Sequence, residues 1–218
     1  YQLLNREREV NTNDSMKGSF LGPKYNNDQI SEFLKEVDGN SHIYNNEDEL
    51  LNEVCSAIES EQIIGWFNGR MEFGPRALGN RSIIGDARSE KTQTQMNLSI
   101  KYRESFRPFA PSVLEEKSQE YFDLDSSSPY MLLVAPIEKS IRSSLTPKDE
   151  DTMKEPDLLK RVRIKRSTIP AVTHVDYSAR VQTVSEPRNG RYYRLIKKFE
   201  QLTGSGVIVN TSFNVRGE

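Results

Sequence analysis

The run formed by residues 68–81 combines residue types that bind anions. It holds three glycines and three arginines and follows a candidate strand. Glycine lets a backbone approach a ligand closely, and the guanidinium group of arginine donates paired hydrogen bonds to phosphate or carboxylate. The Gly-Lys-Ser/Thr of a Walker phosphate loop is missing. Composition alone fits a Gly/Pro turn with solvated arginines equally well, and Glu72 either orients Arg70 or Arg76 or balances their charge.

A second basic run spans residues 101–114. In an extended chain the side chains of Lys101 and Arg103 would point to the same side, because side chains alternate between the two sides of a strand. Two adjacent cations are costly unless an anion lies between them, and Arg107 adds a third positive charge. The alternative is a solvated basic strand edge, which protects proteins against aggregation.

Two further runs carry short polar side chains. In residues 170–182, His174 and Asp176 would share a side if the chain were extended, but two residues are too few for a metal site. A polar strand end with satisfied hydrogen bonds explains them equally well. In residues 209–217 an apolar strand is followed by Asn, Thr, Ser and Asn. These short polar side chains could bind a phosphate or a nucleobase, or they could form an ordinary turn.

Charge is unevenly distributed along this chain of net charge −2. Residues 1–65 contain 13 acidic and 5 basic side chains, residues 66–107 contain 8 basic and 4 acidic ones, and residues 160–198 contain 11 basic and 2 acidic ones. If the two basic segments meet in the fold, they form an anion-binding surface. Otherwise basic and acidic faces pair across the domain.

Composition excludes several classes of protein. With 35% hydrophobic and 28% charged residues, the 218-residue chain has the balance of a globular protein. No apolar run approaches the ~18 residues of a membrane helix, and we expect neither a membrane partner nor a secretory signal. The single cysteine, Cys55, excludes an internal disulfide and a multi-cysteine metal site, so we expect a reduced, cytoplasmic setting. The start at Tyr1 suggests a fragment or a processed chain.

The elements that must position these runs follow from periodicity and turn signals. We expect helices beginning with a cap at Asn27 and spanning residues 48–60, 89–100 and 192–202. We expect strands at residues 63–67, 82–85, 109–114, 131–135, 171–175, 179–184 and 207–209. Residues 138–166 are mostly charged and predict a surface insertion. The order of elements predicts an α/β (α+β mixed) fold, with a twisted mixed β-sheet flanked by helices.

Four blocks of the sequence resemble one protein family. Residues 71–83, Met-Glu-Phe-Gly-Pro-Arg-Ala-Leu-Gly-Asn-Arg-Ser-Ile, resemble the signature of the C-terminal domain of the nodulation-factor O-carbamoyltransferases, a family that includes cephem and aminoglycoside carbamoyltransferases. Residues 106–114, 170–176 and 209–214 match its other blocks in the same order. The resemblance covers roughly residues 65–218, with a looser match at residues 20–23.

The resemblance implies a YrdC-like fold, marked by a Lys-x-Arg pair and a later Ser-x-Asn. Lys101-Tyr102-Arg103 and Ser212-Phe213-Asn214 fit these patterns. It further implies that the domain takes ATP and carbamoyl phosphate, forms carbamoyl-adenylate and releases pyrophosphate and phosphate. An upstream Kae1-like domain, which holds Fe or another divalent metal, would then transfer the carbamoyl group to an acceptor hydroxyl. Residues 1–26 would be a linker from that missing domain, and residues 27–218 a YrdC-like domain truncated at its C-terminus.

The resemblance also assigns roles to individual residues. Reaction at the α-phosphate requires mainly positioning and fixed positive charge. We expect Lys101 and Arg103 to be catalytic. The expected substrate-binding and nucleotide-binding residues are Arg76, Arg107, His174, Arg180, Asn210, Ser212 and Asn214. We expect Mg²⁺ to accompany the nucleotide, but no carboxylate stands out as its ligand and we predict no protein metal site. The Asp-Gly of the family is Asp176-Tyr177 here, a change that could reshape a turn.

Two other functions compete with this one. The first is an RNA-binding YrdC-like module, since residues 160–166 read Lys-Arg-Val-Arg-Ile-Lys-Arg. The near-neutral total charge and the lack of aromatic residues in that run argue against nucleic acid as a partner. The second is a partner module that is inert without its other half.

Overall fold

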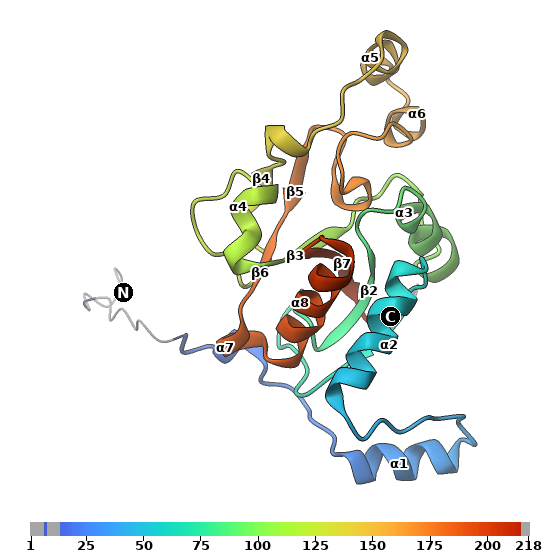
Figure 1. The fold of residues 1–218 in the computed structure, drawn as a ribbon, viewed down its shortest axis with the longest axis vertical. Coiled ribbons are helices and arrows are strands. Elements are labelled where there is room, and N and C mark those ends of the chain that lie inside the picture. The colour runs from blue at the N-terminus through green and yellow to red at the C-terminus, as the bar shows by residue number, and fades with distance from the viewer. Residues whose placement is uncertain (1–6, 8–13, 215–218) are drawn as a thin grey trace.

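A five-stranded mixed sheet forms the centre of the computed structural model, which describes residue 7 and residues 14–214 (Figure 1). Its strands, in spatial order, are β1 (Ile64–Phe67), β2 (Arg81–Asp86), β7 (Val207–Ser212), β3 (Ala110–Leu114) and β6 (Gln182–Val184). Neighbouring strands are antiparallel except for β3 and β6, which run parallel. The prediction of a mixed α/β fold is thus confirmed.

Two long helices cover one face of this sheet, α2 (Glu47–Glu59) and α8 (Arg191–Thr203) (Figure 1). Both were predicted within about one residue, because their apolar side chains recur at helical spacing. The buried cluster between the helices and the sheet contains Leu51, Cys55, Ile58, Trp66, Ile84, Leu195, Ile196, Phe199 and Ile208. Leu202 falls at the same helical spacing but is 49% exposed.

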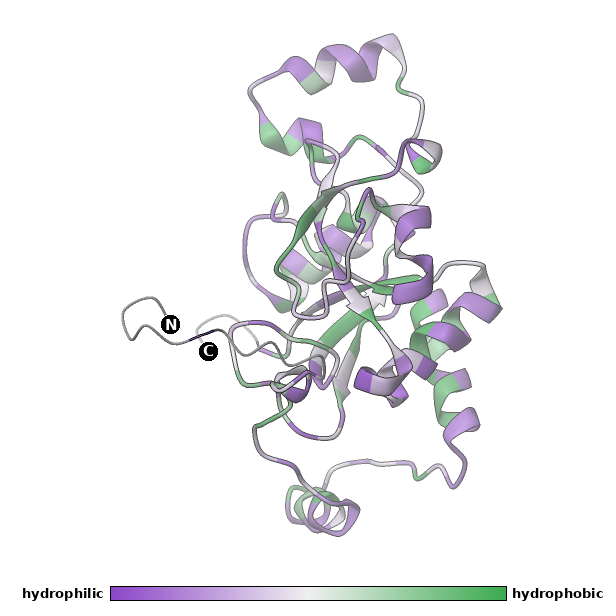
Figure 2. Cartoon of the chain, turned by 90° about the vertical axis from the view of Figure 1, so that its left-hand side faces the viewer, coloured by the Kyte–Doolittle hydropathy of each residue, from purple (hydrophilic) through white to green (hydrophobic). Residues whose placement is uncertain are grey.

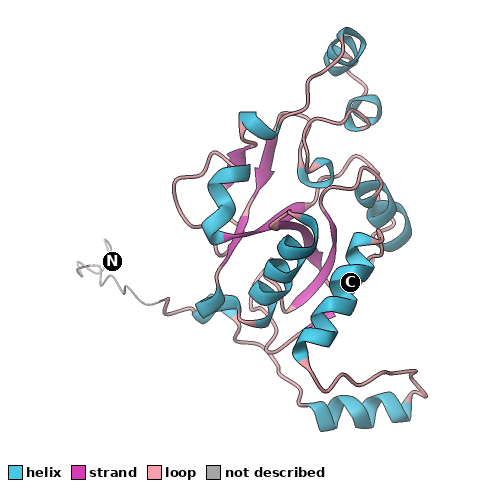
Figure 3. Cartoon of the chain, viewed as in Figure 1, coloured by secondary structure: helices cyan, strands magenta, loops and turns pink. Residues whose placement is uncertain are grey.

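The shorter helices and strands, cyan and magenta in Figure 3, supply the core on the opposite face of the sheet. They are α3 (Thr92–Gln95), the π-helical turn η3 (Met96–Ile100), α4 (Ser118–Tyr121), the 3-10 turn η6 (Pro170–Val172) and the two-stranded ribbon of β4 (Val134–Pro136) and β5 (Ser178–Arg180). The core on this side includes Met96, Phe109, Val113, Ile137, Val207 and Val209. The helix expected from residue 89 therefore begins at Thr92 and widens into a π turn.

Two predicted strands are wrong. Residues 171–175 lie in and after the single turn η6, whose first residue is Pro170. Proline fixes φ near the helical value and so favours a helix start at that position. Residues 131–135 were expected to be a buried strand, but extended pairing begins only at Val134. The Leu132 and Val134 side chains are 68% and 61% exposed.

Helix α1 (Asn27–Glu36) projects away from the sheet at the bottom of Figure 2 and buries none of its residues. Asn26 caps it, one residue earlier than predicted. The Asn26 side chain accepts from the Gln29 amide at 2.8 Å, and the Gln29 side chain accepts from the Asn26 amide at 2.9 Å. This reciprocal capping box explains why the helix begins here without support from the core.

Residues 138–166 form the expected excursion, but the structure gives it regular elements. These are η5 (Lys139–Ile141), α5 (Pro147–Lys154) and α6 (Leu158–Val162), and the two α-helices lie at the top of Figure 1. The excursion is attached by Arg166, which is only 1% exposed. Its guanidinium group donates to the carbonyl oxygens of Arg161 (2.7 Å), Ile164 (2.8 Å), Thr173 (2.9 Å) and His174 (3.1 Å).

The remaining elements are single turns: η2 (Lys17–Ser19), η4 (Glu115–Lys117) and α7 (Glu186–Asn189). Among residues 7 and 14–214, no helix has the length and apolar character needed to cross a bilayer.

Candidate functional site

Lys101 joins two of the predicted blocks at the C-terminal end of β7. Its Nζ atom donates to the carbonyl oxygens of Ser212 (2.6 Å) and Asn214 (2.6 Å) and to Oδ1 of Asn214 (2.9 Å). β3 pairs with β7 only as far as Asn210, so the ammonium group supplies donors where the neighbouring strand has ended. Three acceptors match the three N–H donors of an ammonium group. A substrate oxygen would therefore have to replace one of these contacts.

Arg103 lies in the loop that follows Lys101, and the extended geometry that was predicted to align the two side chains is wrong. The chain is not extended here, because Lys101 ends the π turn with φ −87° and ψ −13° and Tyr102 has φ 46°. Asn97 in the same turn orients Arg103 instead, since Oδ1 of Asn97 accepts from Nε of Arg103 at 2.6 Å. The guanidinium carbon also lies 4.8 Å from the ring centroid of Phe109. Burial, followed by the charge of Arg107, lowers the pKa of Arg103.

Asn97 organises the whole loop after Lys101, and the sequence analysis missed it. It is fully buried, and its amide nitrogen donates to the carbonyl oxygens of Ser105 (3.2 Å) and Arg107 (2.9 Å). The available signal was a polar residue directly after the apolar Met96, which is buried in the core. The Arg107 side chain lies at the rim, where it pairs with Glu104 at 2.8 Å and is 53% exposed.

A second basic cluster contains Arg76, His174 and Arg180. Burial, and then the positive charge of Arg76, lower the pKa of Arg180. The Nε atoms of Arg76 and Arg180 are both buried, and neither has a hydrogen-bond partner within residues 7 and 14–214. Burial also lowers the pKa of His174; Arg180 acts in the same direction, and Asp176 opposes it. Uncompensated cations that share a partly buried location are typical of an anion-binding site.

A tight turn, not an extended strand, sets the position of His174. The amide of Tyr177 donates to the His174 carbonyl at 3.0 Å, and Asp176 Oδ1 accepts from the amide (3.0 Å) and hydroxyl (2.7 Å) of Ser178. The expectation that His174 and Asp176 share a side by extension is therefore wrong. Tyr177 has φ 61°, so it adopts the left-handed conformation that a glycine would occupy without strain.

Asn210 belongs to a buried polar network beneath the loop that carries Arg76. Its amide nitrogen donates to the carbonyl of Ala77 (3.0 Å), to Oε1 of Gln182 (2.9 Å) and to Oγ of Ser112 (3.1 Å). Gln182 in turn donates to the carbonyl of Leu78 at 2.9 Å. These contacts fix the loop against three strands of the sheet. Asn210 Oδ1 is buried without a partner among the described residues.

Glu72 orients neither Arg70 nor Arg76, and its negative charge acts on Arg81, where it opposes the lowering of the Arg81 pKa by burial. Its carboxylate is 6% exposed, and Oε1 accepts from the backbone amides of Leu78 (2.7 Å), Asn80 (2.7 Å) and Arg81 (3.2 Å). The glycine-rich loop thus folds around a carboxylate of its own chain, and these three amides serve that carboxylate instead of a phosphate.

Two of the three arginines in this loop hold the segment near residue 20. Nη1 of Arg70 donates to the carbonyl of Gly22 at 3.1 Å, and Nη2 of Arg81 donates to the carbonyl of Pro23 at 3.3 Å. The backbone of Met71 pairs with both Gly22 and Pro23 at 2.9 Å. Only the third arginine of the loop, at position 76, keeps a guanidinium group directed to the basic cluster.

Three of the five cations in the basic run considered for RNA binding have partners in the described chain, whereas Arg163 is exposed. Arg166 is buried against backbone carbonyls, Lys165 pairs with Glu90 at 3.0 Å, and Lys160 pairs with Glu155.

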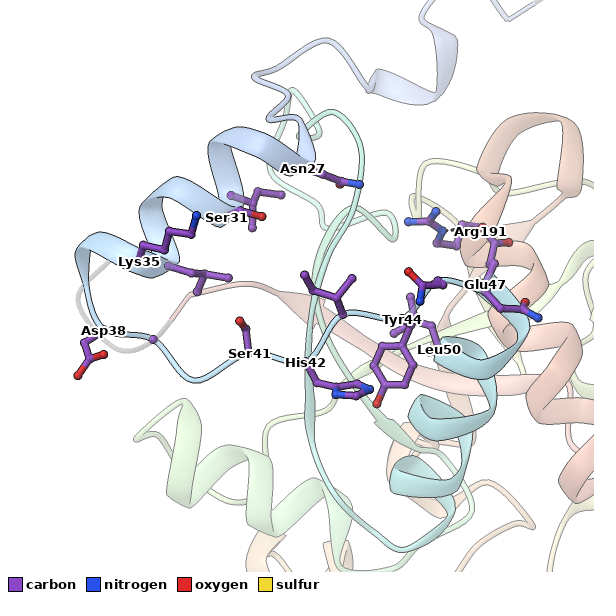
Figure 4. Close-up of a pocket in the computed structure, with 16 residues that line it drawn as sticks. Asn27, Ser31, Lys35, Asp38, Ser41, His42, Tyr44, Glu47, Leu50 and Arg191 are labelled. Atoms are coloured by element: carbon purple, nitrogen blue, oxygen red, sulfur yellow. Dashed lines mark hydrogen bonds and ion pairs between the residues drawn. The ribbon is translucent and has the colours of Figure 1, made fainter.

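An open cleft of about 920 Å³ lies elsewhere, between α1, residues 38–46 and the start of α2 (Figure 4). None of the predicted site residues lines it. Arg191, at one end of the cleft, already pairs with Glu47 at 2.9 Å. The cleft is therefore separate from the two basic clusters.

Comparison with known proteins identifies relatives of the chain. The family model described as "Carbamoyltransferase C-terminus" matches residues 55–218. The chain is 53% identical over 220 residues to the uncharacterized protein sll1178 of Synechocystis sp., covering 100% of the chain and 35% of that protein. It is 41% identical over 170 residues to the nodulation protein NolNO of Sinorhizobium fredii, covering 77% of the chain and 22% of that protein.

A further relative carries an enzymatic name. The chain is 37% identical over 165 residues to the 3'-hydroxymethylcephem-O-carbamoyltransferase of Streptomyces clavuligerus, covering 76% of the chain and 26% of that protein. The chain thus spans about a third or less of the length of these three relatives.

Proposed function

The chain belongs to the carbamoyltransferase C-terminus family, and from this premise we propose that it forms carbamoyl-adenylate from ATP and carbamoyl phosphate. Water splits carbamoyl phosphate into carbamate and phosphate. A carbamate oxygen then attacks the α-phosphorus of ATP, and the new O–P bond forms as the bond to pyrophosphate breaks. Because the reaction consumes ATP, we further propose a cytoplasmic setting.

The observation that carries this proposal is the contact of Lys101 with Ser212 and Asn214. It joins a cation to two polar residues of a distant block, and Asn97 holds Arg103 in the loop that follows Lys101. Phosphoryl transfer needs little covalent chemistry from the protein, so fixed positive charge and positioning supply most of the catalysis. We assign Lys101 and Arg103 to the anionic oxygens of the reacting groups, and Ser212 and Asn214 to the nucleotide.

Arg76 and Arg180 are proposed to bind phosphate oxygens. Bringing two guanidinium groups together without a carboxylate costs free energy in the empty protein, and a polyanion relieves that cost on binding. His174 lines the same cluster, and Arg107 at the rim can attract the nucleotide. Asn210 acts through the loop, because its amide nitrogen holds the carbonyl of Ala77.

Mg²⁺ enters with ATP as the nucleotide complex. The carboxylates near the two clusters are each engaged within the chain. Glu72 accepts three backbone amides, Glu104 pairs with Arg107, and Asp176 accepts from Ser178. They do not fit the role of a ready protein ligand for the ion, so we derive no step through it.

The second half-reaction is proposed to take place outside this chain. In proteins of its relatives' length, a preceding Kae1-like domain with Fe or another divalent metal would transfer the carbamoyl group to an acceptor hydroxyl. The name of the Streptomyces clavuligerus relative describes such an acceptor, a hydroxymethyl group, for that protein. We therefore propose a hydroxyl-bearing small molecule as the final acceptor.

Carbamoyl-phosphate-dependent exchange of labelled pyrophosphate into ATP tests the first half-reaction. We expect exchange that requires carbamoyl phosphate and falls about 10²–10³-fold in Arg180→Gln, as when one fixed donor to a transition-state oxyanion is lost. The exposed Arg163 provides the matched control Arg163→Gln. Exchange that is independent of carbamoyl phosphate, or equal in Arg180→Gln and Arg163→Gln, would refute the proposal.

A further inference from the structure

Three consecutive apolar side chains are exposed at the start of β4. Leu132 is 68% exposed, Leu133 is 42% exposed and Val134 is 61% exposed, whereas the flanking Met131 and Ala135 are buried. We call residues 132–134 the β4 shelf. A run of exposed apolar side chains on a folded surface marks a site that another surface covers.

The β4 shelf borders the second basic cluster. Val134 is paired with Arg180 in the β4–β5 register, so the two side chains lie on the same face of the ribbon. The opposite face carries the paired Ala135 and Ala179, which are buried in the core. Nη2 of Arg180 also lies 4.0 Å from the sulfur of Met131. A surface that covers the shelf would therefore cover Arg180 as well.

The N-terminal segment is fixed against Tyr130, two positions before Leu132, the first residue of the shelf. The Tyr130 hydroxyl donates to Oδ1 of Asp14, and Oδ2 of Asp14 accepts from Nε of Arg188 (3.3 Å) and from the amide of Gly18 (2.9 Å). Tyr130 and Phe20 both pack against the cluster of Leu78, Ala110 and Met131. Asp14 is thus held by a residue that immediately precedes the buried Met131 and the shelf.

We propose that the β4 shelf is the docking surface for the part of the polypeptide that precedes this chain in proteins of its relatives' length. The matched family is named for a C-terminus, and the chain spans 35% of the Synechocystis relative that it matches throughout. The remaining length of such a protein reaches this domain through the segment that Asp14 anchors. The occupant is therefore tethered beside the apolar surface, which raises its effective concentration there.

Docking on the shelf would also shield the Arg76–Arg180 cluster from water. Exclusion of water strengthens electrostatic interactions and protects a hydrolysable intermediate. This second consequence rests on the proposed function, whereas the docking surface itself does not. The two can therefore fail separately.

Hydrogen–deuterium exchange tests the docking surface by comparing two proteins. The first is the 218-residue chain. The second is a fusion in which this chain follows the part of the Synechocystis relative that the match leaves uncovered. We expect amides of residues 130–136 to exchange at least tenfold more slowly in the joined protein. Leu132→Asp and Val134→Asp should abolish this protection. Leu202→Asp, at a leucine on α8 that is 49% exposed, should retain it.

Several outcomes would overturn the proposal. Equal exchange of residues 130–136 in both proteins is one. Another is a dimer of the 218-residue chain, seen by analytical ultracentrifugation, that dissociates when Val134→Asp is introduced. The shelf would then bind a second copy of the chain. If an Asp variant loses its fold by circular dichroism, Val134→Ser gives the same comparison with a milder change. Protection without pyrophosphate exchange would refute the proposed function alone, and pyrophosphate exchange without protection would refute the docking surface alone.

Discussion

The ammonium group of Lys101 donates a hydrogen bond to the carbonyl oxygen of Ser212 at 2.6 Å, although 111 positions separate the two residues. The amide of the next residue, Phe213, donates to the carbonyl oxygen of Arg81 on β2. Because the C=O and N–H of one peptide unit point in opposite directions, the Ser212 carbonyl faces the other side of β7, where β3 has ended. Lys101 therefore closes an open strand edge and also places a positive charge there. The two roles make different predictions.

Lys101→Met should lower both stability and activity. The substitution leaves the carbonyl oxygens of Ser212 and Asn214 without this buried donor, which should cost about 1–3 kcal/mol of the free energy of unfolding. Pyrophosphate exchange should fall at least 100-fold at saturating ATP, because the positive charge is lost as well. Urea unfolding and exchange kinetics measure the two effects.

The matched control for this variant is Lys91→Met, since the Lys91 side chain is 79% exposed and pairs with Glu61 at 3.3 Å. It should change stability by less than about 0.5 kcal/mol. If Lys101→Met lost stability but kept full exchange activity under conditions in which it is folded, Lys101 would be a structural residue only.

Glu72→Gln should loosen the loop that carries Arg76. One carboxylate oxygen accepts three backbone amides, and hydrogen bonds to a charged acceptor are stronger than those to a neutral one. We expect a loss of about 1–3 kcal/mol in the free energy of unfolding and a higher KM for ATP. The exposed Glu120 gives the control Glu120→Gln, and equal unfolding midpoints for the two variants would contradict this role for Glu72.

The elements with a strong hydrophobic period were predictable from sequence. Helices α2 and α8 and strand β7 bury the side chains that their spacing indicates, apart from Leu202 near the end of α8. Residues 131–135 were wrongly predicted to be a buried strand because a run of apolar residues has the composition of one. Burial there is decided by the pairing of β4 with β5, which no local pattern reveals.

The residues that position the site were harder to find. The four blocks were recognised through a family resemblance, whereas spacing within each block gave the wrong local geometry around Lys101 and His174. Asn97, Gln182 and the actual role of Glu72 depend on hydrogen bonds to backbone groups that are distant in sequence or brought close by a turn. Such contacts leave no periodic signal, so a single sequence does not predict them.

His174 should make stability depend on pH. Burial lowers the pKa of His174 below its usual value of 6.5. Below about pH 6.5 the His174 side chain is therefore protonated in the unfolded chain but still neutral in the folded protein. The free energy of unfolding falls as pH decreases toward the pKa of His174 in the folded protein. The slope should approach, at most, about 1.4 kcal/mol per pH unit. This window lies above the range in which Asp176 titrates, because the pKa of Asp176 is lowered from 3.8.

Urea unfolding between pH 5 and 7.5 measures this slope. His174→Gln should flatten it, whereas the control His42→Gln, at an exposed position, should keep the profile of the unsubstituted protein. If the slope persisted unchanged in His174→Gln, another group would be responsible for it.

Gly79→Ala should destabilise the protein far more than Gly204→Ala, although both glycines adopt a positive φ. Gly79 has φ 105°, and a Cβ atom there would lie 2.1 Å from the ring of Tyr192. That ring is buried and held by a hydrogen bond from its hydroxyl to Ser112 at 2.9 Å, so it has no free space to move into. Gly204, with φ 77°, has nothing within 4 Å of the same position.

We therefore expect Gly204→Ala to cost about 1 kcal/mol, the price of the left-handed conformation alone. Gly79→Ala adds overpacking and should cost about 3 kcal/mol or more. It should also weaken the hydrogen bond from the Trp66 indole to the Gly79 carbonyl, which tryptophan fluorescence reports. Equal unfolding midpoints in urea would mean that the loop shifts freely over Tyr192, and that its close packing does not hold Arg76 in place.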